Sequence, residues 1–257
     1  MSLGENALGL LKRRLPPALS FKLRCLKAEM VDAEMGSLEA LAKTVGGQNS
    51  VALDVGANSG IYSRMLSRHF GRILSVEPYP DCARYMKAVL PGNCTVIEAA
   101  ASAKTGVATL RVPISRGQLN STRATISSDN RFGDLELAGT QDVVVRTAPL
   151  DTIISDEVRP DERVGLIKVD VEGHEFEAIS GAKDAIRRWR PALYVEVEDR
   201  HGAKTSELFD LFDELGYQVV RLRDGQYVPD ESFAEPTSRA IAWQSTPSVN
   251  LVLCPRS

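Results

Sequence analysis

Beyond residue 47, short apolar runs alternate with stretches that carry a helical pattern of apolar positions. Runs of this kind, bounded by turn residues, are typical of buried strands. They are VALDVG from Val51, RILSVE from Arg72, CTVIEAA from Cys94, VGLIKVDV from Val164, ALYVEVE from Ala192, YQVVRL from Tyr217 and NLVLC from Asn250. Apolar positions at three- and four-residue spacing predict helices over residues 60–69, 80–90, 173–189 and 204–215. This alternation predicts a doubly wound α/β fold whose mostly parallel sheet is covered on both faces.

Two regions depart from the alternation. Residues 1–47 mix apolar and basic positions and predict two or three amphipathic helices that end near Gly46 and Gly47. We interpret them as a helical cover on the sheet, with a substrate lid or a membrane-surface patch as alternatives. The chain is thus divided into an N-terminal helical extension, residues 1–47, and a main domain, residues 48–257.

The second departure covers residues 105–145. VATLRVP and DVVVRT read as additional strands, and the segment between them is polar and rich in turn residues. Long loops inside compact domains often bind ligands, so we interpret this insertion as a substrate-facing loop. A mobile surface excursion is the alternative.

Composition narrows the function. The 257 residues carry a net charge of -3, which gives no overall attraction to nucleic acid. The four cysteines form no C-x-x-C pair, so neither a zinc site nor a disulfide framework is indicated, and a reducing cytoplasm fits best. The apolar segments around Lys12 are short and interrupted by Pro16 and Pro17. We therefore expect a cytoplasmic protein without stable membrane insertion.

The first two strands end in features of a nucleoside site. In an open parallel sheet, ligands bind outside the carboxyl ends of the strands. LDVGANSG opens a helix through a glycine turn, and Glu77 follows at roughly the twenty-residue distance of a ribose-binding acid. Asn58 occupies the position where a dinucleotide site needs glycine, which favours S-adenosylmethionine, a nucleoside without phosphate. Alternatively, Asp54 caps the helix and Glu77 is a solvated strand end.

Several motifs occur in a familiar order: DVGANSGIYS, VEPY, LDTII, IKVDVEGHEFEAISGA and PALYVEVE. With them the chain resembles the FkbM-type family of S-adenosylmethionine-dependent methyltransferases, over roughly Val51 to Val197. The resemblance implies a seven-stranded Rossmann-like sheet in which NLVLC inserts antiparallel beside YQVVRL. It also implies O-methylation of a small-molecule hydroxyl on a sugar, glycolipid or natural product.

The resemblance also implies roles for individual residues. It places the ribose at Glu77 and the adenine near Ala100, Ala101 and Ser102. Asp170, at the end of a central strand, would emerge beside the same cofactor. The residues implied around the methionine part are Asp54, Gly56, Ala57, Asn58 and Gly60.

Charged positions alternate with apolar ones in two central strands. Lys168, Asp170 and Glu172 share one face of the first, and Tyr194, Glu196 and Glu198 share one face of the next. Unpaired charges inside a sheet cost several kcal/mol each, so these groups must be paired, hydrated, protonated or bound to metal. Asp170, Glu196 and Glu198 are candidate ligands for magnesium, a second candidate cofactor. A buried ion pair of Lys168 with Asp170 or Glu196 is the alternative.

A hydroxyl acceptor needs a general base, or a metal that lowers its pKa. His174 directly follows the strand and is the candidate base, with Lys168 and Asp170 as further candidate catalytic residues. His201 is a second candidate, and for His69 we expect no chemical role. Alternatives to O-methylation are N-methylation, a nicotinamide-dependent Rossmann enzyme and a non-catalytic cofactor-binding protein. The acceptor's identity and the oligomeric state do not follow from the sequence.

Overall fold

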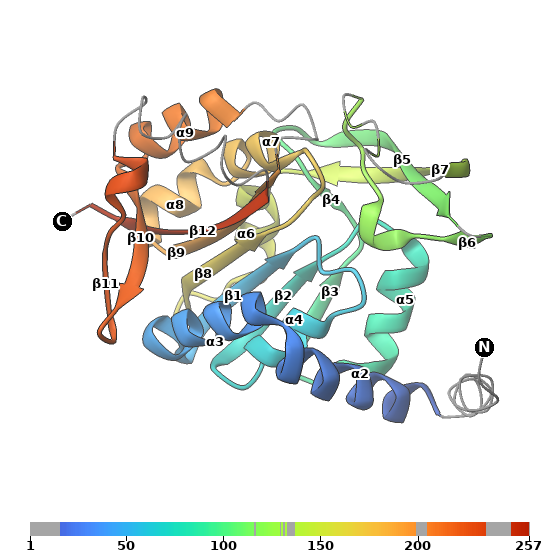
Figure 1. The fold of residues 1–257 in the computed structure, drawn as a ribbon, viewed down its shortest axis with the longest axis horizontal. Coiled ribbons are helices and arrows are strands. Elements are labelled where there is room, and N and C mark those ends of the chain that lie inside the picture. The colour runs from blue at the N-terminus through green and yellow to red at the C-terminus, as the bar shows by residue number, and fades with distance from the viewer. Residues whose placement is uncertain are drawn as a thin grey trace.

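The computed structural model describes residues 16–256 except 116, 129, 131, 133–136, 199–204 and 235–247. Within these residues, one sheet has eight strands and a second has four (Figure 1). In spatial order the first contains β11 (Gln226–Pro229), β10 (Tyr217–Arg223), β12 (Ser248–Pro255), β9 (Ala192–Glu198), β8 (Arg163–Val169), β1 (Gly47–Val55), β2 (Phe70–Val76) and β3 (Cys94–Ile97). The second contains β4 (Ala100–Ala101), β7 (Leu137–Ala148), β5 (Gly106–Ser115) and β6 (Gln118–Leu119).

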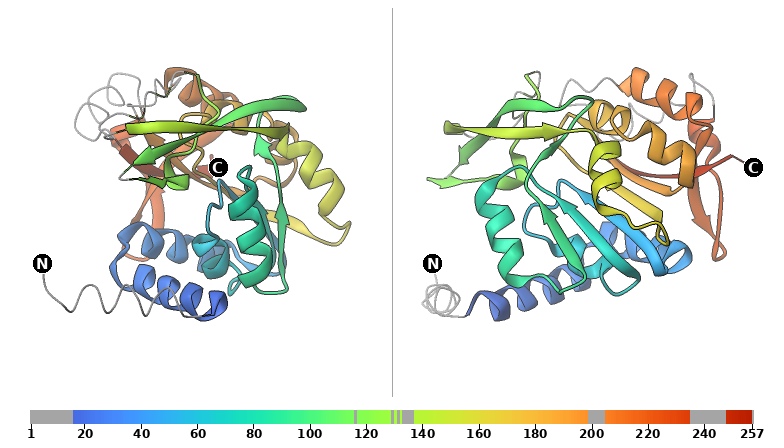
Figure 2. Two further views of the ribbon diagram at one scale, coloured as in Figure 1. Left: turned by 90° about the vertical axis from the view of Figure 1, so that its right-hand side faces the viewer. Right: turned by 180° about the vertical axis from the view of Figure 1, so that it is seen from behind.

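Helices cover both faces of the large sheet (Figure 2). Alternate residues of β1 point to opposite faces, so Leu53 and Ala52 belong to different hydrophobic clusters. Leu53 packs with α6 (Leu150–Glu157), α7 (Glu175–Ser180), α8 (Lys183–Trp189) and α9 (Thr205–Glu214). Ala52 packs with α3 (Ala33–Val45) and α4 (Ile61–Leu66). The predicted fold class is confirmed.

Three details differ from the expected strands and helices. β11 adds an eighth strand at the sheet edge, where it pairs antiparallel with β10. The expected antiparallel insertion of β12 between β9 and β10 is present and is not one of these differences. The second difference is that the third strand ends early, because Ala100 and Ala101 pair with β7 in the second sheet. The helix expected over residues 173–189 is divided: the Gly181 carbonyl accepts from the Asp151 amide, and the Asp151 carboxylate accepts from the amides of Asp184 and Ala185, capping α8.

The N-terminal helical cover is present from α2 (Pro17–Val31) onward, and residues 1–15 lie outside the described part. α2 packs on α4 and on α5 (Pro80–Val89), and α3 packs on α4 and β8. The Asp32 carboxylate accepts from the amides of Glu34 and Met35 and so begins α3, which ends at Val45 as expected. Among the described helices, none combines the length and apolar character needed to cross a bilayer. The division at residue 47 stays a prediction.

The insertion contains both predicted strands. β5 and β7 pair antiparallel as a long hairpin, and a cluster that includes Leu110 and Val145 packs against Tyr79 and Cys82 of the α5 region. Between them lies the short helix η1 (Ser121–Arg123), whose Ser121 hydroxyl donates to Asn58 in the turn after β1. A second short helix, η3 (Glu231–Phe233), follows β11. Residues of the insertion, Ser121 to Ala124 among them, line a cavity at the carboxyl ends of the central strands, and the role of a substrate-facing loop stays a prediction.

Candidate functional site

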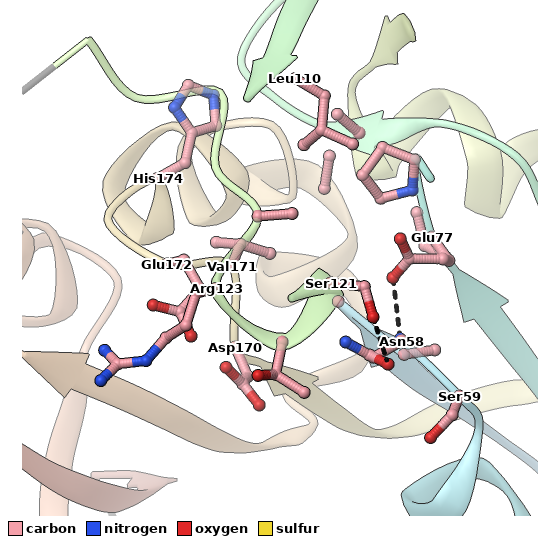
Figure 3. Close-up of a pocket in the computed structure, with 18 of the residues that line it drawn as sticks. Asn58, Ser59, Glu77, Leu110, Ser121, Arg123, Asp170, Val171, Glu172 and His174 are labelled. Atoms are coloured by element: carbon pink, nitrogen blue, oxygen red, sulfur yellow. Dashed lines mark hydrogen bonds between the residues drawn. The ribbon is translucent and has the colours of Figure 1, made fainter. Parts of the chain in front are cut away.

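A cavity of about 350 Å³ lies at the carboxyl ends of β1, β2, β8 and β9, under the insertion (Figure 3). The cofactor-binding residues predicted from the sequence are largely here. Those that line the cavity are Gly56, Ala57, Asn58, Glu77, Ala101 and Asp170, together with Ala100, His174 and Glu196. The volume is within the range of ordinary small-molecule sites.

The glycine turn brings two strand ends into direct contact. Gly56 has a φ of +77°, and a Cβ added there would lie 1.8 Å from the Asp170 carbonyl oxygen. The Asp170 amide in turn donates to the Val55 carbonyl at 3.0 Å. Only glycine allows this approach, because any side chain would overlap the backbone of the neighbouring strand. Gly60 also has a positive φ, at the start of α4, but it is not among the lining residues.

Glu77 is a buried carboxylate on the cavity wall. The residue is 6% exposed, and its carboxylate oxygens accept from the Asn58 and Tyr79 amides, each at 2.8 Å. Burial raises the pKa of Glu77 to about 7, although the two amide hydrogen bonds oppose the shift. A carboxylate oxygen has two acceptor lone pairs, so each oxygen can accept one more hydrogen bond. Glu77 is therefore a carboxylate held in place by two backbone amides, with capacity to accept two further hydrogen bonds.

Asn58 connects the turn to the insertion. Its φ is +48°, a left-handed conformation that asparagine tolerates better than most residues. Its Oδ1 accepts from Ser121 Oγ at 3.5 Å, and Cys82 Sγ lies 3.8 Å away. The asparagine that argued against a dinucleotide therefore has a structural role: it holds η1 over the cavity (Figure 3).

Lys168 lies beneath the cavity between two carboxylates. Its side chain is 3% exposed, and its Nζ lies 3.0 Å from Asp170 Oδ2 and 3.3 Å from Asp54 Oδ1. Burial alone would lower the pKa of Lys168, but the charges of Asp170 and Asp54 outweigh burial and raise it. Nζ also lies 4.6 Å from the centre of the Tyr62 ring. The buried ion pair that the sequence allowed is thus formed with Asp170, and Asp54 is a second partner.

Asp54 and Lys168 lie behind the cavity wall and do not line the cavity. Asp54 is fully buried, its Oδ2 accepts from Ser63 Oγ at 2.6 Å, and it is not a lining residue. Lys168 is likewise buried and is not a lining residue. The expected contact of Asp54 with the cofactor and the catalytic role of Lys168 stay predictions. Asp170 is the member of this cluster that reaches the cavity.

His174 lines the cavity at the start of α7. Its Nε2 lies 3.1 Å from Ser102 Oγ, and its Nδ1 lies 3.5 Å from a Glu177 carboxylate oxygen. A carboxylate beside Nδ1 favours the proton on that nitrogen, which leaves Nε2 as the acceptor. Ser102, expected near the adenine, contacts this imidazole but does not itself line the cavity.

The candidate magnesium ligands come together only in part. Asp170 and Glu196 line the same cavity, and the side chain of Glu198 lies outside the described residues. Among the residues that the structure describes, no three His, Cys, Asp or Glu side chains form a group that could hold a metal ion. His201 is also outside the described residues, and His69 contacts Glu39 at 3.2 Å, away from the cavity.

Several lining residues were not found by sequence reasoning. Arg24 of α2 and Tyr62 of α4 both line the cavity, and Arg24 donates to Ser59 Oγ at 3.0 Å. Arg123 comes from η1, inside the insertion that the sequence did mark. No local signal distinguishes Arg24 from the other basic residues of its helix, because its position depends on how α2 packs.

Comparison with known proteins identifies the family of this chain. The model of the Methyltransferase FkbM domain matches residues 54–219. Methyltransferase sdnD of Sordaria araneosa is 27% identical in an alignment of length 221, and the match covers 74% of this chain and 82% of that protein. The solved structure of methyltransferase FkbM from Methylobacillus flagellatus KT is 18% identical with a TM-score of 0.46, and the match covers 96% of this chain and 57% of that one.

A TehB-like SAM-dependent methyltransferase from Corynebacterium glutamicum is 12% identical with a TM-score of 0.44, and the match covers 93% of this chain and 98% of that chain. The chain thus spans little more than half of the Methylobacillus structure and nearly all of the Corynebacterium one. The resemblance seen in the motifs is confirmed by the family match, which extends over more than half of the sequence. The chain belongs to the FkbM methyltransferase family.

Proposed function

We propose that this protein transfers the methyl group of S-adenosylmethionine to a hydroxyl of a small molecule, in the class of sugars, glycolipids or natural products. The observation that carries the proposal is the pairing, in one cavity of an FkbM domain, of the glycine turn with the buried acceptor Glu77. A nucleoside with two ribose hydroxyls and no phosphate matches that pair.

The lining residues fit the parts of this cofactor. Glu77 would accept the two ribose hydroxyls, and the small side chains of Ala100 and Ala101 leave room for the adenine. The turn at Gly56 would hold the methionine part, close to the carboxylate of Asp170. The bound cofactor supplies an electrophilic methyl on a sulfonium cation. A carboxylate nearby stabilises that positive charge.

His174 is the group we assign to proton removal from the acceptor. His174 lines the cavity, and Glu177 beside Nδ1 orients the ring. The acceptor hydroxyl would replace Ser102 as the hydrogen-bond partner of Nε2. His174→Ala should lower turnover by about 10² to 10⁴-fold with S-adenosylmethionine affinity nearly unchanged, since the cofactor does not need this proton transfer. Turnover retained by the folded variant would remove His174 from the chemistry.

N-methylation is the second candidate, and one observation favours it. The carboxylates of Asp170, Glu172 and Glu196 all line the cavity, and such a wall attracts a protonated amine. Matched acceptors that differ only in a hydroxyl or an amine at one position would separate the two. Methylation of the amine alone would replace the proposed O-methylation.

Calorimetric titration with S-adenosylmethionine and with NAD tests the cofactor assignment. We expect binding of S-adenosylmethionine and none of NAD. Binding of NAD alone would support the nicotinamide alternative and overturn the proposal. S-adenosylmethionine binding without turnover on any acceptor of either class would point to a non-catalytic cofactor-binding protein.

A further inference from the structure

α2 has a row of apolar side chains in solvent, on the side away from the protein. Exposed fractions along the row are 44% for Leu19, 49% for Leu23, 46% for Leu26 and 85% for Met30. Since each residue advances by about 100°, these four lie within an arc of about 60°. The buried Phe21 lies on the opposite side, where α2 packs on α4 and α5. Figures 1 and 2 show this helix at the outer edge of the molecule.

Basic side chains flank the row. Lys22 and Lys27 are exposed and lie about 70° to either side of its centre. The surrounding sequence has the same sign: residues 6–31 contain six Lys and Arg and one acidic residue, Glu29, in a chain whose net charge is -3. The outer face of α2, defined here by the four apolar residues and these two lysines, is therefore apolar at its centre and positive at both margins.

We propose that the outer face of α2 docks the protein on the surface of an anionic lipid bilayer, with the helix axis parallel to the membrane. The apolar row would enter the headgroup boundary, and the lysines would extend to lipid phosphates on either side. Charge complementarity selects this occupant, because a negative surface attracts each nearby lysine while the acidic remainder of the chain is repelled. Binding to vesicles does not depend on the proposed methyl transfer.

The docking helix also borders the cavity. Arg24, on the protein-facing side of α2, lines the cavity and contacts Ser59 of the glycine turn. Docking would therefore hold the cavity close to the lipid surface. If the proposed function holds, this position suits an acceptor that is itself a lipid or is linked to one.

Vesicle flotation of the full chain tests docking without any acceptor. Vesicles of phosphatidylcholine alone are compared with vesicles containing phosphatidylglycerol. We expect binding only to the anionic vesicles, weakened by high salt. Lys22→Gln with Lys27→Gln should lower the partition coefficient by about 25-fold, from roughly five-fold per lysine. Leu23→Ser with Leu26→Ser should lower it by about ten-fold or more.

The matched control replaces exposed apolar residues elsewhere. Val107 and Val144, which are 75% and 74% exposed on the β5–β7 hairpin, should tolerate replacement by serine with vesicle binding unchanged. All six positions are exposed, so the variants should fold, and thermal unfolding checks this. Wild type that binds neither vesicle, or both equally, would overturn the proposal. So would self-association in solution that the Leu23 and Leu26 changes abolish while vesicle binding stays intact.

Discussion

Replacement of Glu77 by glutamine removes the charge from the cavity wall while keeping the size of the side chain. One oxygen becomes an amide nitrogen, which then faces a backbone N–H at the position of the present 2.8 Å hydrogen bonds. A hydrogen bond to a charged group makes a net contribution of about 1 to 3 kcal/mol, once the hydrogen bonds with water that it replaces are taken into account. The dissociation constant for S-adenosylmethionine at pH 8 should therefore rise by about 5- to 150-fold.

The same side chain makes cofactor binding depend on pH. Burial raises the pKa of Glu77 from 4.5 to about 7, so the free protein loses the carboxylate as the pH falls below 7. Ribose hydroxyls favour the ionised form, so wild-type affinity should fall by up to ten-fold per pH unit below 7. The glutamine variant should lack this component, and its own pH profile accounts for every other titrating group. Calorimetry at pH 6 and pH 8 measures both effects.

The sign for stability is opposite to that of an ordinary ion-paired carboxylate. Because the pKa in the folded state lies above 4.5, the folded protein binds more protons than the unfolded chain between pH 4.5 and 7. The free energy of unfolding therefore falls as the pH rises through this window, and Glu77→Gln should flatten that slope. Glu98→Gln, at an exposed carboxylate paired with Lys87, is the control. Equal S-adenosylmethionine affinity of the folded variant and wild type at pH 8 would refute the reasoning.

Three further changes test the surroundings of the cavity. Gly56→Ala should lower the melting temperature and abolish cofactor binding, since its Cβ would overlap the Asp170 carbonyl. Gly92→Ala, with open space around the glycine, should do neither. Equal melting curves for the two variants would contradict the clash at Gly56. Lys168→Met should lower the free energy of unfolding by about 3 to 5 kcal/mol in denaturant titration, because it leaves Asp54 buried without its cation, and a change under 1 kcal/mol would count against the buried pair. The charge of Asp170 is already balanced by Lys168 Nζ, so treatment with a chelator should leave turnover unchanged. Loss of turnover that magnesium restores would instead support the metal site.

Most of the fold could be predicted because its signals are local. The apolar runs of β1, β2, β8 and β9 are strands by length and composition, and each is followed by a helical pattern. The division between α7 and α8 could not be predicted, since it depends on Asp151, about thirty residues earlier in the chain, whose carboxylate caps α8. The Asp151 amide also donates a hydrogen bond to the Gly181 carbonyl.

The candidate site was also predicted only in part, because some of its residues have local signals and others depend on distant partners. Gly56, Asn58 and Glu77 follow strand ends, and the topology of a parallel sheet brings such residues together. The alternation in β8 indicated ionisable groups on one face but not which of them reach the cavity: Asp170 does, and Lys168 stays beneath it. That outcome depends on the extra partner Asp54, which comes from another strand.

A crystal structure of the protein with S-adenosylhomocysteine tests the central claim most directly. We expect the two ribose hydroxyls within hydrogen-bond distance of the Glu77 carboxylate, and the amino-acid part beside the turn at Gly56 and the carboxylate of Asp170. The adenine should lie near Ala100 and Ala101. A ligand bound elsewhere on the protein, or one in the cavity with its ribose away from Glu77, would contradict the account.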